Sequence, residues 1–267
     1  MNLNKLAKLL EKISKKDSLQ VLSLTKLVDY GENKGKYIAL IVNNCKELSK
    51  IVLDGIELED VDTNYIVEII TLNSPNLTYI DLSFNKFKLT NENIVTSFIK
   101  NTWFKTIILK GLELDEYIPF LVTSLENCKH LEHLDISNNK VGSFINSFNN
   151  LFYFGINIKV LGLNSCDLFD EYFAVLLEIL AENQNLIELS VNSNEITNMS
   201  AQTIVVFFST NKALKKLSLL KNKIYEKDLT SLLDEENMNK CLLDNDDEHL
   251  ESELRESNRS KKRELIK

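Results

Sequence analysis

The sequence predicts an α/β solenoid, in which parallel strands line a concave face and helices cover the convex side. The prediction rests on one recurring phrase: an apolar residue, further apolar residues three and five positions later, then Asn, Cys or an apolar residue three positions on. Its copies begin at Leu19, Leu48, Leu77, Phe104, Leu131, Ile158, Leu186 and Leu214. The steps between copies are 29, 29, 27, 27, 27, 28 and 28 residues, a spacing typical of repeat architectures.

Each element of the repeat follows from its own periodicity. Within the phrase, apolar residues two apart, such as Ile80 and Leu82, point to the same face of a strand. Between phrases the apolar residues have helical spacing, as in Phe173, Leu176 and Leu180. One strand, turn and helix cannot bury both apolar stripes, so about eight repeats are expected to stack around a shared core.

The last position of the phrase belongs to the turn after the strand. It is occupied in order by Leu27, Ile56, Asn85, Leu112, Asn139, Cys166, Asn194 and Asn222. An Asn side chain can bond to backbone groups of a turn that has no strand partner. The aliphatic residues at this position cannot form these hydrogen bonds and must stabilise the turn by packing instead.

These features resemble the ribonuclease-inhibitor-like class of leucine-rich repeat proteins. That class has periods of this length, long helices, and turn positions where Asn alternates with Cys or aliphatic residues. The resemblance covers residues 19–235, although the strict alternation fails at the first two turns and the last two. It implies a horseshoe-shaped fold that contributes a binding surface.

The chain is predicted to have three parts. Residues 1–18 form an amphipathic, lysine-rich helix that caps the first repeat, with contact to an anionic membrane as the alternative. Residues 19–243 form the repeat domain with its C-terminal cap. Residues 244–267 form a charged tail.

In the tail, the acidic residues Glu251, Glu253 and Glu256 are followed by Leu265 and Ile266. This pattern resembles the C-terminal translocation signal of some bacterial type IV secretion effectors. A solvated or disordered end and a nuclear targeting segment are the alternatives. The expected location is therefore the cytoplasm, or the host cytosol after secretion.

Composition argues against several classes of function. The net charge is −8 and no concave column collects Lys or Arg, so nucleic acid is not an expected partner. The sequence contains no run of about 18 uncharged apolar residues, so no membrane span is predicted. The 4 cysteines form no C-x-x-C or Cys/His cluster, which predicts buried thiols in a reducing compartment and no metal site. No cofactor is predicted, and the chain is expected to be a monomer.

Residues between the apolar strand positions are predicted to face the concave surface and bind a protein partner. Adjacent strands are about 4.8 Å apart, so side chains of neighbouring repeats form continuous columns. A central patch of mixed charge, with an aromatic and an aliphatic centre, suits a protein interface. The predicted binding residues are Tyr79, Asp81, Ser83, Ile108, Lys110, His133, Asp135, Ser137, Val160, Asn164, Glu188 and Asn192.

His133, Asp135 and Ser137 have the residue types of a hydrolase triad, but no catalytic residue is predicted. Side chains two apart on a strand are separated by about 6.6 Å, whereas a nucleophile and its base must approach to about 3 Å. The sequence also has no Gly-rich phosphate loop and no metal-ligand cluster.

Residues 141–158 contain no charged residue and form the most apolar convex segment. Alignment with later repeats predicts that Phe148 and Phe152 are core residues. Tyr153 and Phe154 have no equivalent among the core positions of the later repeats, and a bent or shortened helix is expected to bury them. An exposed apolar patch that docks a partner is the alternative.

The sequence therefore predicts a non-catalytic scaffold that binds a protein through its concave face, as a bacterial effector secreted into host cells. The alternative is a resident cytosolic regulator, such as an enzyme inhibitor or a GTPase-regulating module.

Overall fold

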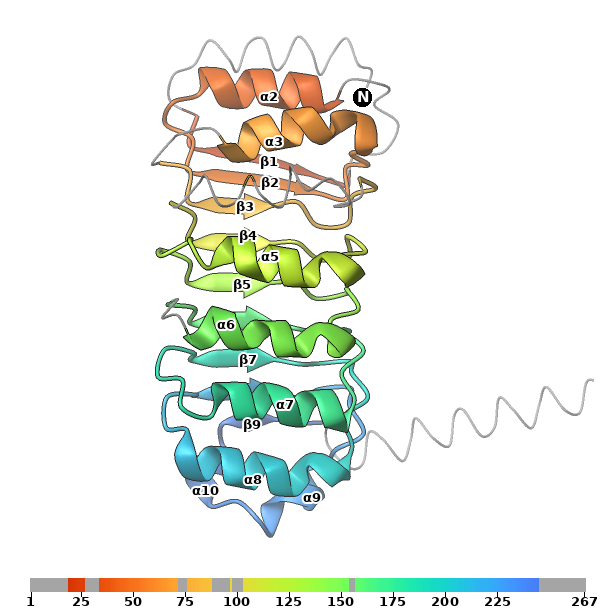
Figure 1. The fold of residues 1–267 in the computed structure, drawn as a ribbon, viewed down its shortest axis with the longest axis vertical. Coiled ribbons are helices and arrows are strands. Elements are labelled where there is room, and N and C mark those ends of the chain that lie inside the picture. The colour runs from red at the N-terminus through yellow and green to blue at the C-terminus, as the bar shows by residue number, and fades with distance from the viewer. Residues whose placement is uncertain are drawn as a thin grey trace, which may run out of the picture.

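The computed structural model contains one continuous parallel sheet with helices along its outer side (Figure 1). It describes residues 19–26, 34–71, 76–87, 97, 103–153 and 157–244. The predicted capping helix of residues 1–18 and residues 245–267 of the predicted tail lie outside these described residues.

The described sheet has 9 strands in chain order, each paired in parallel with the next. They are β1 Val21–Thr25, β2 Lys50–Asp54, β3 Tyr79–Asp81, β4 Thr106–Ile108, β5 His133–Asp135, β6 Val160–Gly162, β7 Glu188–Ser190, β8 Lys216–Ser218 and β9 Cys241–Leu242. The first eight lie where the phrase predicts them. Strand β9 lies in the predicted C-terminal cap, where no phrase occurs, and pairs Leu217 with Cys241. The sequence thus predicts one strand too few.

The strand register follows the phase of the phrase. Tyr79 pairs with Thr106, Thr106 with His133, His133 with Val160, and Val160 with Glu188. Residues at equal positions of successive repeats therefore stand side by side, and the columns predicted for the concave face are correct.

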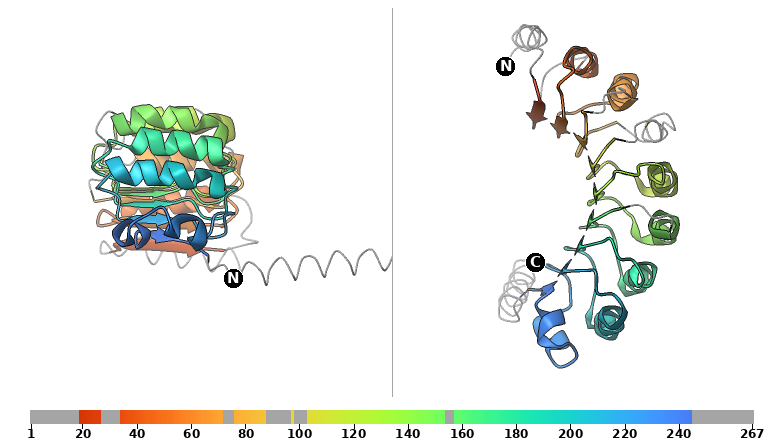
Figure 2. Two further views of the ribbon diagram at one scale, coloured as in Figure 1. Left: turned by 90° about the horizontal axis from the view of Figure 1, so that it is seen from below. Right: turned by 90° about the vertical axis from the view of Figure 1, so that its left-hand side faces the viewer.

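The helices lie on the convex side, so the molecule is an open arc with strands inside and helices outside (Figure 2). The α-helices are α2 Lys34–Asn44, α3 Thr63–Thr71, α5 Ile118–Leu125, α6 Phe148–Tyr153, α7 Asp170–Leu180, α8 Ala201–Thr210, α9 Glu226–Thr230 and α10 Glu235–Met238. Four 3-10 helices are described: η1 Asp60–Asp62, η2 Asp115–Tyr117, η3 Gly142–Ser147 and η4 Asn198–Ser200.

One apolar core runs between the sheet and the helices. The strands contribute residues such as Ile80 and Leu82, and α7 contributes Phe173, Leu176 and Leu180, all buried as their spacing predicts. Because each repeat covers the core of its neighbours, stability is shared along the array.

Each of the first eight strands is followed by a residue in the left-handed backbone region, at the same position of every repeat. These residues are Lys26, Gly55, Phe84, Gly111, Asn138, Ser165, Ser193 and Lys221. Glycine adopts this conformation without steric cost, but only two of the eight are glycines. The backbone is therefore held there by its repeat neighbours.

The four turn asparagines bond to the preceding repeat, as their chemistry predicts. Nδ2 of Asn139 donates to the carbonyls of Leu109 (2.9 Å) and Ile136 (2.8 Å). Its Oδ1 accepts from the N–H groups of Leu112 (3.0 Å) and Leu114 (3.2 Å). Similar bonds are made by Asn85, Asn194 and Asn222.

Turns without asparagine use a different backbone. In each of these turns, a second residue with positive φ follows the turn residue. These are Glu57 (57°) after Ile56, Glu113 (50°) after Leu112 and Asp167 (54°) after Cys166. Each of these turns donates a backbone N–H to the asparagine of the following repeat. Asn222 instead bonds to the turn that contains Asn194.

The cysteines behave as packing residues. Cys45, Cys128 and Cys166 are buried, as predicted, and none of the four cysteines forms a disulfide bond. Burial raises the pKa of Cys128 and of Cys166 to about 12, so neither thiol ionises near neutral pH.

Candidate functional site

The concave sheet surface carries the predicted binding residues, but they differ in accessibility. The half-exposed ones are Tyr79, Asp81, Lys110, His133, Val160, Asn164, Glu188 and Asn192. The buried ones are Ser83, Ile108, Asp135 and Ser137. A partner can therefore reach only the first group directly.

The accessible residues at the first position of strands β2 to β7 form a row across the sheet, which we call the exposed row: Lys50, Tyr79, Thr106, His133, Val160 and Glu188. The Nζ atom of Lys50 lies 3.8 Å from the centroid of the Tyr79 ring, a cation–π contact. Lys216 forms an ion pair of 3.5 Å with Glu188 at the other end. The row has a cationic start, an aromatic and aliphatic middle, and an acidic end.

Beside the row, Lys110 and Asp135 form an ion pair of 2.8 Å. Asp135 lies against Gly162, where an added Cβ would come within 2.5 Å of its Cγ atom. The missing side chain of Gly162 thus makes room for the Asp135 carboxylate, which is withdrawn from solvent and neutralised by Lys110.

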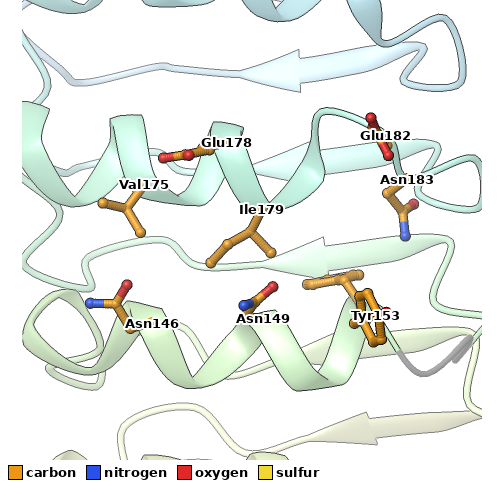
Figure 3. Close-up of a pocket in the computed structure, with 9 residues that line it drawn as sticks. Asn146, Asn149, Tyr153, Val175, Glu178, Ile179, Glu182 and Asn183 are labelled. Carbon is orange, nitrogen blue, oxygen red and sulfur yellow. The ribbon is translucent and has the colours of Figure 1, made fainter.

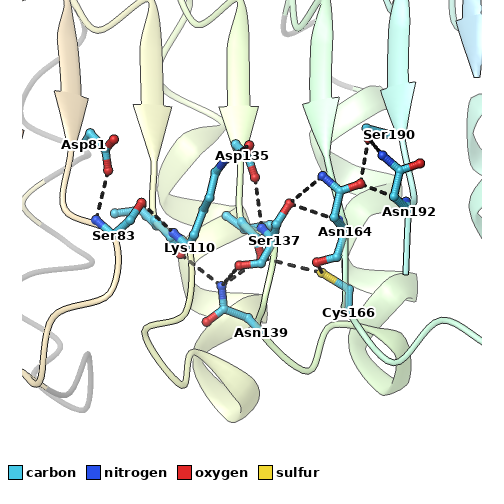
Figure 4. A network of polar contacts seen from close by, with 12 residues as sticks. Asp81, Ser83, Lys110, Asp135, Ser137, Asn139, Asn164, Cys166, Ser190 and Asn192 are labelled. Atoms are coloured by element: carbon cyan, nitrogen blue, oxygen red, sulfur yellow. Dashed lines mark hydrogen bonds and ion pairs between the residues drawn. The ribbon is translucent and has the colours of Figure 1, made fainter. Parts of the chain in front are cut away.

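Polar side chains just beyond the strands extend the sheet (Figure 4). Each accepts a hydrogen bond from the backbone N–H of the equivalent residue in the next repeat: Ser83 from Lys110 (3.1 Å), Ser137 from Asn164 (2.9 Å), Asn164 from Asn192 (2.8 Å) and Asn192 from Leu220 (2.8 Å). We call this series the polar ladder. It satisfies N–H groups that have left the strand pairing.

Two aspartates accept hydrogen bonds from backbone N–H groups that the ladder does not bind. Lys110 precedes Ser137 in the column, and an ammonium group cannot accept a hydrogen bond. The Ser137 N–H donates instead to Oδ1 of Asp135 (3.1 Å), and the Ser83 N–H donates to Oδ1 of Asp81 (3.0 Å). The predicted residues of the ladder are therefore bonded within the sheet, which sequence analysis missed. The recurrence of Ser or Asn at this position was the available signal.

The protein environment shifts the pKa of two side chains in the exposed row, His133 and Tyr79. Burial lowers the pKa of His133 and outweighs the opposing effect of Asp135, so its ring is mainly neutral at pH 7. Burial, with the nearby charges of Asp81 and Asp135, raises the pKa of Tyr79. Both groups therefore offer neutral hydrogen-bonding rings near neutral pH.

The apparent triad is not assembled for catalysis. The Asp135 carboxylate is bound by Lys110 and by the Ser137 N–H, and Oγ of Ser137 is bound by the backbone and side chain of Asn164. In the described part of the chain, no group of three or more His, Cys, Asp or Glu residues is arranged to hold a metal ion. No described helix has the length and apolar character to cross a bilayer.

The convex segment of residues 141–158 is partly as predicted. Phe148 and Phe152 are buried, and the helix is shortened because η3 precedes the six residues of α6. The expectation that Tyr153 is buried is wrong, since its side chain is 81% exposed at the end of α6. Phe154 lies outside the described residues.

Comparison with known proteins agrees with this geometry. A family model described as Leucine Rich repeat matches residues 73–89, 127–143 and 182–205, the segments that contain Asn85, Asn139 and Asn194. No curated protein sequence matches the chain.

Solved structures share the architecture at low sequence identity. Internalin C2 of Listeria monocytogenes is 17% identical with a TM-score of 0.50, over 90% of this chain and 92% of that chain. A Bacteroides fragilis protein is 19% identical with a TM-score of 0.54, over 90% and 70% of the two chains. At these identities the likeness concerns the fold alone. Together with the nine-stranded sheet, these matches show that the chain folds as an α/β leucine-rich repeat solenoid.

Proposed function

We propose that the protein is a non-catalytic scaffold that binds a protein partner through its concave face, centred on the exposed row. The observation that carries this proposal is the row itself: half-exposed aromatic, imidazole, aliphatic and charged side chains on adjacent strands of one sheet. Leucine-rich repeat domains commonly mediate protein interactions. The alternating turns also support placing the chain in the ribonuclease-inhibitor-like class.

The rigidity of the site favours this function. The polar ladder and the turn asparagines fix neighbouring strands in register, so the row is already ordered before a partner arrives. Preorganised side chains lose less conformational entropy on binding, and a few central residues supply most of an interface's energy. Tyr79 and His133 are the expected central residues, whereas the buried ladder residues act by holding the surface in place.

The triple substitution Tyr79→Ser, Asp81→Asn and His133→Ala is expected to abolish partner capture without unfolding the array. The first and third changes remove the two central rings, and Asn at position 81 keeps the oxygen that accepts the Ser83 N–H. The immobilised chain is exposed to cell lysate, and retained proteins are identified by mass spectrometry beside the unmodified chain. Thermal unfolding monitors the fold.

A convex variant is the matched control. Phe120→Ser with Val206→Ser removes two exposed apolar side chains from α5 and α8. It should retain the partners that the concave variant loses. Loss from the convex variant alone would place the binding surface elsewhere.

The biological setting proposed from the sequence is that of a bacterial effector secreted into host cells, with a resident cytosolic regulator as the alternative. Support comes from the tail sequence, which lies outside the described residues. Deleting residues 245–267 is expected to stop export in a secretion reporter assay and leave thermal unfolding unchanged. Undiminished export, or none from the full chain, would favour the resident regulator.

A further inference from the structure

A groove lies between the neighbouring helices α6 and α7 (Figure 3). Both helices lie on the convex side of the sheet (Figure 2). Its volume is about 530 Å³. The segment before α6 contributes Asn146, while α6 contributes Asn149, Phe152 and Tyr153. Helix α7 and the turn after it contribute Val175, Glu178, Ile179, Glu182 and Asn183.

The floor of the groove is apolar. Phe152 is buried, and Val175 and Ile179 are half-buried against the core. Tyr153 adds a ring that is 81% exposed, although a side chain of this size gains free energy when it is removed from water. A ligand lying in the groove would cover this ring.

The charge of the groove has one sign. Glu178, in the last turn of α7, and Glu182, in the turn that follows the helix, are both exposed, and neither has an ion-pair partner among the described residues. The opposite wall contributes amide groups and no charge, because residues 141–158 contain no charged side chain. The groove therefore combines an apolar floor, one acidic wall and one neutral polar wall.

We propose that this groove is a second binding surface, and that its occupant is a basic amphipathic helix of a protein partner. A helix fits between two parallel helices by ridge-into-groove packing. Its apolar stripe would cover Ile179 and Tyr153, and Lys or Arg residues four apart would meet Glu178 and Glu182. The proposal is independent of the concave site, since no lining residue belongs to the exposed row.

The test measures binding of a fluorescent peptide to the full chain by anisotropy. The probe is an amphipathic helix of about 18 residues, long enough for helical structure, with a leucine stripe and lysines four apart beside it. A matched probe carries glutamate at the lysine positions. The basic probe is expected to bind at least about tenfold more tightly, and increasing salt should weaken it.

Variants assign the binding to the groove. Glu178→Gln with Glu182→Gln is expected to weaken the basic probe by about tenfold, and Tyr153→Ser by a similar factor. Glu171→Gln changes another exposed carboxylate of α7 that does not line the groove, and should have no effect. The concave triple variant should also bind the probe normally, which separates this proposal from the concave one.

Several outcomes would overturn the proposal. One is equal binding of the acidic and basic probes, another is no binding of either, and a third is binding that the paired Glu178 and Glu182 substitutions leave unchanged. Sedimentation that reveals a dimer abolished by the same pair would assign the groove to a second copy of the chain. Thermal unfolding of each variant confirms that the fold persists.

Discussion

Replacing Asn139 with alanine is expected to lower the free energy of unfolding by about 3–5 kcal/mol, because several buried backbone groups lose their partner at once. The Asn139 side chain is buried and joins two repeats through both its oxygen and its nitrogen. An alanine leaves the N–H groups of Leu112 and Leu114 without their acceptor inside the protein. Guanidinium unfolding followed by far-ultraviolet circular dichroism measures the change.

Two comparisons identify the cause. Asn149→Ala removes an exposed amide from α6 and is expected to cost less than about 0.5 kcal/mol. Cys166→Ala alters a turn without asparagine, where the thiol makes weak contacts of 3.6 Å and 3.4 Å with carbonyl oxygens, and its cost should fall between those of the other two substitutions. A cost for Asn139 as small as that for Asn149 would mean that the turn asparagines do not hold the repeats together.

Gly142→Ala is expected to destabilise the protein by about 2–3 kcal/mol through overpacking. A Cβ atom at this position would lie 2.3 Å from the Asp167 carbonyl oxygen and 2.7 Å from Cδ2 of Tyr172. The first contact is with backbone, which cannot rotate away. The Gly142 N–H also donates to the carbonyl of Cys166 (3.0 Å), so this loop sits directly on the next repeat.

The neighbouring substitution Ser143→Ala is the control, since Ser143 is exposed in the same 3-10 helix. It should change the free energy of unfolding by less than about 0.5 kcal/mol. Equal stability of the Gly142 and Ser143 variants under thermal and guanidinium unfolding would show that Gly142 does not lie in such close contact with the backbone of Asp167.

The repeat period was sufficient to predict the architecture. The phase of the phrase predicts the first eight strands and their register, because a two-residue strand period and a fixed repeat length leave little freedom. The bonding capacity of an amide predicts the role of Asn139 and its equivalents. Strand β9 escaped prediction because a two-residue pair needs no apolar phrase of its own.

The candidate site was less predictable. Alternation along a strand predicts which face of the sheet a side chain points to, but not how exposed that side chain is. Asp135 faces the concave side yet is buried, since Gly162 leaves space for it and Lys110 pairs with it. Ser137 likewise belongs to the polar ladder. These contacts cross between repeats, so they depend on the identity of residues 25–27 positions away in sequence.

The most direct test of the central claim places a photo-crosslinking amino acid in the sheet surface. Benzoylphenylalanine at position 79 or 133 is expected to crosslink the captured partner, whereas the same group at position 120 on α5 should not. Crosslinking from position 120, with none from 79 and 133, would contradict recognition by the concave face.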